Sequence, residues 1–228
     1  MLTPSVDSQE FYQSQRGRVT QAILRAHVDR LWPDISGTRI LPLGSGALLL
    51  GSLPFVSGRM TATQGETFSC FVDSKNKPLP DADLDRIVAL HAMATSSDME
   101  LGLREAWRTL KGEGRLLIVV PRRCGAWAKK PDTPFGREEA YSGRQIKKAL
   151  TDQGFIVTRI RRALFAPPDG AEAFLSLAYK IETIAPFLFF GGGVLFVEGR
   201  KRVCGFAGAK KRAREHSRNP LLPLPLPI

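Results

Sequence analysis

The sequence predicts an α/β protein with an open, doubly wound, mostly parallel sheet and helices on both faces. Strand-like and helix-like segments alternate along the chain, as expected where crossover helices join parallel strands. A continuous apolar run at 116–120, ended by Pro121, is typical of a strand that is buried on both faces of such a sheet. An earlier apolar strand runs into Gly44-Ser45-Gly46, a close glycine pair of the kind found between a strand and a helix.

The amino-terminal half is expected to begin with one helix. Within residues 10–32, Val19, Ile23 and Leu31 lie near helical spacing, and Pro33 ends the pattern. A further helix is predicted after the glycine pair, reaching about Leu53. The strands expected in this half are at 38–43, a short one within 54–67, 68–73 and 85–90.

The carboxyl-terminal half continues the alternation. We predict a helix that is capped by Ser97 and reaches Leu110, and a second that runs from Ser142 to about Gln153, with Gly154 as its carboxyl cap. Between the 116–120 strand and the second helix lies a long irregular insert. The remaining elements are expected as the insert at 122–141, strands at 155–165 and 194–202, and a helix at 171–182.

Composition indicates one globular domain with an extension. Of 228 residues, 43% are hydrophobic and 24% charged, which is ordinary for a soluble protein. The net charge is +11, and residues 199–228 contribute +7 of it with eight Lys or Arg and one Glu. We therefore expect a domain over 1–202 and a disordered, basic, Pro-rich tail over 203–228, which could contact nucleic acid weakly or could simply be solvated.

Several classes of function are disfavoured. The three cysteines and three histidines are scattered, so neither a metal site nor a disulfide framework is predicted. The amino terminus is polar and acidic, unlike a secretory signal, and a reducing, cytoplasmic location is expected. The longest apolar run, 184–197, has 14 residues, short of the ~20 that a transmembrane helix needs, and is interpreted as a turn and a buried strand.

The glycine pair does not match the common nucleotide-binding motifs. A phosphate loop starting at Gly46 would need a lysine directly after Gly51, where Ser52 stands. A dinucleotide fingerprint would need glycine at Leu49, and a nucleophile elbow would need glycine at Leu43 and Ala47. A loop that admits a nucleoside-like ligand without phosphates remains, and S-adenosylmethionine (SAM) is the common one. A plain turn without a ligand is the open alternative.

Further stretches resemble class I SAM-dependent methyltransferases. The stretch KPLPDADLDRIVALHAM at 77–93 is similar to the signature around the family's fourth strand, and LKGEGRLLIVVP at 110–121 to that of its fifth. The stretch YSGRQIKKALTDQGFIV at 141–157 is similar to the following helix and strand, and Thr-Pro-Phe-Gly at 133–136 resembles an insert of a bacterial subgroup. The resemblance covers about residues 10–202 and implies a Rossmann-like methyltransferase fold with SAM as cofactor.

The resemblance also implies a cofactor site. Gly44 and Gly46 would lie behind the methionine part of SAM, and Tyr12 in the leading helix would close over the cofactor. Asp73 would accept a hydrogen bond from the adenine amino group, and the backbone of Ser74 would face the ring.

His91 is the catalytic candidate, because its position matches the one beside the methyl group, where it could act as general base. A satisfied, half-buried histidine is the alternative. The chain departs from the family where Pro42 replaces a carboxylate and Leu48 a third glycine. Two hypotheses follow: a SAM-dependent methyltransferase with an unidentified acceptor, or a non-catalytic binding or regulatory protein that keeps the fold.

Overall fold

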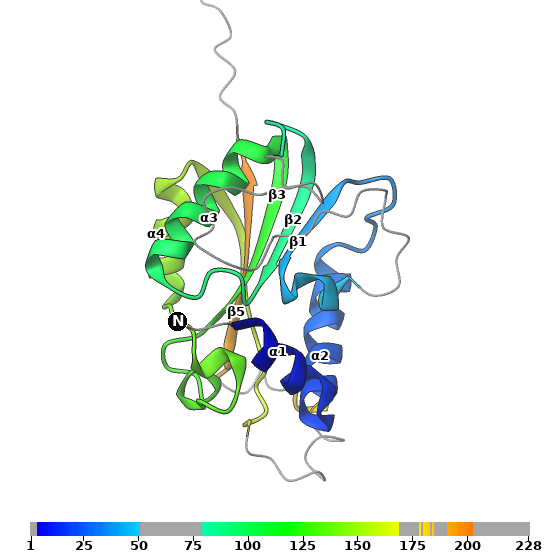
Figure 1. The fold of residues 1–228 in the computed structure, drawn as a ribbon, viewed down its shortest axis with the longest axis vertical. Helices are drawn as coiled ribbons and strands as arrows, with labels where there is room; N and C mark the ends of the chain where they lie inside the picture. The colour runs from blue at the N-terminus through cyan, green and yellow to red at the C-terminus, as the bar shows by residue number, and fades with distance from the viewer. Residues whose placement is uncertain are drawn as a thin grey trace, which may run out of the picture.

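The structure, a computed structural model, describes residues 4–50, 79–168 and 191–202, together with positions 178, 180–182 and 184. Its centre is a five-stranded sheet with the order β1-β2-β3-β5-β4 (Figure 1). The strands are β1 (Ile40–Gly44), β2 (Leu84–Leu90), β3 (Leu110–Pro121), β4 (Phe155–Ala163) and β5 (Val194–Lys201). Because β1, β2 and β3 are parallel and β5 is antiparallel to both β3 and β4, four strands share one direction. The predicted mostly parallel sheet is confirmed.

Helices cover both faces of the sheet, as predicted (Figure 1). They are α1 (Pro4–Gln13), α2 (Gln15–Leu31), α3 (Ser96–Thr109) and α4 (Gly143–Asp152), with short 3-10 turns η1 (Ser45–Leu49), η2 (Trp127–Lys129) and η3 (Pro134–Gly136). Residues of α3 and α4 pack on one face with Ile87, whereas α2 packs on the other with Val88. Both faces of β2 are therefore buried, which explains its continuous apolar sequence.

The predicted leading helix is two helices. Ser14 separates them and caps α2, accepting a hydrogen bond from the Gly17 N–H at 3.0 Å. A Cβ on Gly17 would lie 1.9 Å from the Phe11 carbonyl oxygen, so glycine allows α1 to pack against the first turn of α2. This break lets α1 turn toward the end of the sheet (Figure 1).

Several predicted boundaries were wrong. The cap of α3 is Thr95, not Ser97, because Thr95 and Asp98 form a reciprocal capping box. Strand β3 begins at Leu110 rather than at 116, and Glu113, with φ of +67°, is accommodated within it. After β1 the chain forms the five-residue turn η1 instead of entering an α-helix directly.

Other predicted segments lie outside the described residues. These are the strands at 54–67 and 68–73, most of the helix at 171–182 and the tail at 203–228. Within the described part of the chain, no helix is both long and apolar enough to cross a membrane. Val194–Val197, the end of the longest apolar run, is a buried part of β5.

Candidate functional site

The candidate site lies at the carboxyl edge of the parallel strands, where β1 and β2 end side by side. Gly44, the last residue of β1, pairs with Leu90, the last residue of β2. Gly44 has φ of +59°, and a Cβ there would lie 2.4 Å from the Leu90 carbonyl oxygen, so only glycine permits this reversal of the chain. Its backbone is also exposed, and it can therefore be approached by a ligand.

Gly46 has a different environment. It is buried, and a Cβ there would lie 2.4 Å from the Val88 carbonyl oxygen. Close packing of η1 on β2 is enough to require glycine at this position. Its contact with a cofactor stays a prediction.

His91 directly follows β2 and is held on both ring nitrogens. Its Nε2 lies 2.8 Å from the hydroxyl of Tyr12, and its Nδ1 is hydrogen-bonded to a carboxylate oxygen of Glu138. The His91 side chain is only 4% exposed, and its ring centroid lies 4.6 Å from that of Phe135. His91 also has φ of +54°, an uncommon backbone conformation for a non-glycine residue that occurs more often at functional sites.

Three separate segments bring these side chains together. Tyr12 comes from the last turn of α1, His91 from the end of β2 and Glu138 from the insert that follows β3. In the insert, a Cβ on Gly136 would lie 1.9 Å from the Lys130 carbonyl oxygen, so the loop closes tightly on itself. The fully buried Phe135 anchors that loop beneath His91, which places Glu138 beside the imidazole.

The electrostatic environment fixes the direction of the hydrogen bonds. Burial, with a smaller contribution from the charge of Glu138, raises the pKa of Tyr12 well above its ordinary value. The phenol therefore stays protonated. Because the Glu138 carboxylate can only accept, Nδ1–H of His91 donates to it, and Nε2 of a neutral imidazole then accepts from the Tyr12 hydroxyl. A hydroxyl, an imidazole and a carboxylate in this order form the arrangement by which enzymes prepare a histidine to accept a proton.

The space between the described residues beside His91 is narrow. The space beside His91 measures about 170 Å³ between atoms and admits no water-sized sphere. It is lined by Ala89, His91, Ala92, Met93, Ile118, Val119, Val120 and Glu138. An acceptor could therefore reach Nε2 of His91 only if it replaced the Tyr12 hydroxyl.

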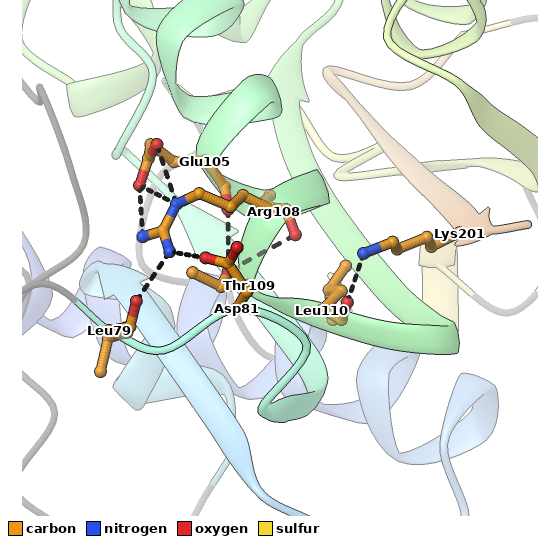
Figure 2. A network of polar contacts seen from close by, with 8 residues as sticks. Leu79, Asp81, Glu105, Arg108, Thr109, Leu110 and Lys201 are labelled. Carbon is orange, nitrogen blue, oxygen red and sulfur yellow. Dashed lines mark hydrogen bonds and ion pairs between the residues drawn. The ribbon is translucent and has the colours of Figure 1, made fainter. Parts of the chain in front are cut away.

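A larger cavity of about 610 Å³ lies at the opposite, amino edge of the sheet. Figure 2 shows Arg108, at the end of α3, bound to the carboxylates of Glu105 and Asp81 and to the carbonyl of Leu79. Lys201, at the end of β5, donates to the Leu110 carbonyl at 2.6 Å and lies 4.2 Å above the Trp107 ring. These contacts join α3 to the starts of β2 and β3.

The structure brings together part of the predicted site. Tyr12 and His91 are in contact, and Gly44 touches the backbone of His91, since a Cβ on Gly44 would lie 2.9 Å from its carbonyl carbon. Asp73 and Ser74 lie outside the described residues. Glu138 was not among the residues predicted from the sequence, because nothing in the order of residues shows that the insert folds back onto the end of β2.

Strand order, a reversed β5 between β3 and β4, and helices on both faces together define the class I SAM-dependent methyltransferase fold. Among solved structures, this chain is similar to a SAM-dependent methyltransferase, a possible histamine N-methyltransferase, from Thermotoga maritima. That likeness has a TM-score of 0.60 at 16% identity and covers 85% of this chain and 94% of the other. The predicted fold is thus confirmed.

Two further solved structures with this fold differ in the chemistry that their names give. A SAM-dependent methyltransferase from Archaeoglobus fulgidus aligns with a TM-score of 0.51 at 15% identity, covering 85% of this chain and 99% of the other. The [4+2]-cyclase SpnF aligns with the same TM-score of 0.51 at 19% identity, covering 79% and 80%. One fold thus carries different chemistries, and the site must decide the function. No family model and no curated protein matches the chain.

Proposed function

We propose that the protein is a SAM-dependent methyltransferase in which His91 takes a proton from the acceptor. The observation that carries the proposal is the chain Tyr12–His91–Glu138 at the carboxyl edge of the sheet. In open α/β sheets ligands bind at this edge. The fold, shared with SAM-dependent methyltransferases, supports SAM as the cofactor.

The described residues fit SAM in two respects. Gly44 exposes backbone at the end of β1 without a side chain, and a proton-accepting imidazole stands next to it. Asp73 and Ser74 would contact the adenine, and Tyr12 would close over the bound cofactor. SAM supplies an electrophilic methyl group on a sulfonium.

The protein's own residues would activate and position the acceptor. The acceptor hydroxyl or amine takes the place of the Tyr12 hydroxyl, 2.8 Å from Nε2 of His91, and gives its proton to that nitrogen. Glu138 holds Nδ1–H, which orients the ring and stabilises the positive charge that the imidazole gains. Burial beneath Phe135 excludes water from the proton transfer.

The remaining features belong to the same proposal. Residues 1–202 form the methyltransferase domain, and the tail at 203–228 makes weak contacts with nucleic acid. The acceptor is a small molecule or macromolecule with an ionisable O–H or N–H group, and the location is cytoplasmic.

Isothermal titration of the full chain with SAM and with S-adenosylhomocysteine tests the cofactor. We expect saturable binding of both, and His91→Gln should bind them with unchanged affinity because it acts on the acceptor. An absence of binding at millimolar ligand would overturn the proposal and favour a non-catalytic binding or regulatory protein with the same fold.

Incubation with methyl-labelled SAM and fractionated cell extract tests the transfer. Labelling of an acceptor should fall about 10²- to 10⁴-fold in His91→Gln, the range expected for loss of a general base. Equal labelling by the variant and the parent protein would remove His91 from the mechanism while leaving cofactor binding intact.

A further inference from the structure

Three arginines lie side by side on one face of the sheet, near its amino edge. Arg86 of β2 pairs with Arg115 of β3, and Arg115 pairs with Arg200 of β5. Residues in register on neighbouring strands have their side chains on the same face. This arginine row, Arg86, Arg115 and Arg200, crosses three adjacent strands on the face that carries α2.

Contacts confirm which face the row occupies. Arg115 donates to Glu198 at 3.0 Å, Glu198 accepts from the Trp32 indole at 2.9 Å, and Trp32 follows α2 directly. The guanidinium of Arg86 lies 5.1 Å from the Trp32 ring centroid. Arg159 of β4, which pairs with Glu198, adds a fourth cation next to the row.

Like charges directly opposite one another destabilise a sheet, so the row needs compensation. The pKa of Arg86 is lowered, first by burial and then by the charge of Arg115. Two carboxylates pair with these cations: Glu198 serves both Arg115 and Arg159, and the exposed Glu113 serves Arg200 at 2.9 Å. Asp34 and Asp85 add weaker attraction on Arg86.

Donors on the row are left without acceptors. Among the described residues, Nη1 of Arg86 and Nε of Arg200 are buried and have no hydrogen-bond partner. Buried donors are normally satisfied by protein groups or by ordered water. The row is nonetheless accessible: the side chains of Arg115, Arg200 and Arg159 are 40%, 38% and 47% exposed.

The ligand should be an extended anion. The row lies near the amino end of the face that carries α2, where Ile156, the partner of Arg200, is 38% exposed. At a strand spacing of ~4.8 Å, three arginines span about 10 Å, the axial length of roughly three phosphates on one nucleic-acid strand. Trp32 is only 4% exposed and offers no ring for base stacking, so recognition would use phosphates alone.

We propose that the arginine row and Arg159 bind the phosphate backbone of a nucleic-acid strand without sequence preference. Guanidinium groups suit phosphates because their planar donors match two oxygens at once. This interface goes beyond the proposed methyl transfer, lies toward the other edge of the sheet from His91, and does not depend on the acceptor's identity.

Fluorescence anisotropy of the full chain with a labelled, mixed-sequence 20-nucleotide RNA tests the proposal. The test variant is Arg159→Gln/Arg200→Gln, which keeps Arg115 as the partner of the buried Glu198. The matched control is Arg104→Gln/Arg144→Gln on the exposed surfaces of α3 and α4, which changes the net charge equally. Thermal melting checks that both variants fold.

We expect at least fivefold weaker binding by the test variant than by the control. The slope of log K against log salt should also become shallower by about 1.4, since each lost phosphate contact removes ~0.7. A DNA strand of the same sequence should show the same loss. Equal RNA affinities of the test and control variants would overturn the proposal. It would also be overturned if the test variant bound vesicles of anionic phosphatidylserine more weakly than the control but bound RNA equally well. SAM titration of the test variant should be unaffected, so the result is independent of the cofactor test.

Discussion

The two edges of the sheet hold ionisable groups in opposite ways. At the carboxyl edge, Tyr12, His91 and Glu138 are buried and bonded to one another in one chain. Toward the amino edge the charges are mostly exposed, and one of them, Arg108, binds two carboxylates (Figure 2). At the carboxyl edge, burial strengthens the interactions among a few ionisable groups. Toward the amino edge, solvent screens the interactions among many charges. The difference teaches that the proposed proton transfer and the proposed binding of a nucleic-acid strand need different surroundings, although both use ionisable side chains.

Glu198 is the exception at the amino half, and it gives the largest expected effect. Its carboxylate is 1% exposed and accepts from Trp32, Thr158 and Arg115. Glu198→Ala should lower the free energy of unfolding by about 2–3 kcal/mol, because it leaves the buried indole N–H of Trp32 without its acceptor. Glu113→Ala, which removes a carboxylate that is 61% exposed, should change it by less than ~1 kcal/mol. Urea unfolding measures both, and equal losses would contradict the distinction between buried and screened charges.

Gly46 tests whether the glycine pair is structural. Gly46→Ala places a Cβ 2.4 Å from the Val88 carbonyl oxygen and should destabilise the protein by about 1–3 kcal/mol. Gly143→Ala is the control, because a Cβ there meets nothing within 4 Å. If calorimetry shows that both variants melt alike, close packing does not explain Gly46. A destabilised variant would also mean that loss of SAM binding on substitution cannot by itself assign the residue to the cofactor site.

Protonation of Glu198 should contribute to the loss of folding stability at low pH. Burial by itself raises the pKa of Glu198, but hydrogen bonds from Trp32, Thr158 and Arg115 outweigh it, and the net pKa is lowered. A lowered folded pKa contributes stability that is present above the ordinary glutamate value of about 4.3 and is lost as pH falls through the folded value. Melting temperatures between pH 3 and 6 should therefore fall more steeply for the parent protein than for Glu198→Gln. Parallel curves would show that other carboxylates dominate the acid response.

The smallest expected effect concerns Tyr12. Loss of its hydroxyl in Tyr12→Phe removes the hydrogen bond to His91 and should cost about 0.5–1.5 kcal/mol. In a double-mutant cycle with His91→Gln, the coupling energy should fall in the same range, measured by chemical unfolding. A coupling energy of zero would mean that the two side chains do not interact in solution, and the hydroxyl–imidazole–carboxylate chain would then be incorrect.

Local pattern was enough to predict the sheet and much of the helix placement. The apolar run in β3 and the alternation of elements predicted a buried parallel sheet, and Ser142 was correctly expected at the start of α4. The errors came from contacts between segments. Gly17 looks like an ordinary helical residue until Phe11 packs against it, and Thr95 caps α3 only because Asp98 reciprocates.

The candidate site likewise combines residues that the sequence predicted with contacts that only the structure shows. Short motifs by themselves determined that His91 and Gly44 each follow a predicted strand and that Tyr12 lies in a leading helix, because strand and helix periodicity are properties of neighbouring residues. Only the tertiary structure decided that Glu138 contacts His91 and that Arg86, Arg115 and Arg200 form one row. Those contacts join residues from 29 to 85 positions apart, and their partners are chosen by loop folding and strand register, which no local pattern encodes.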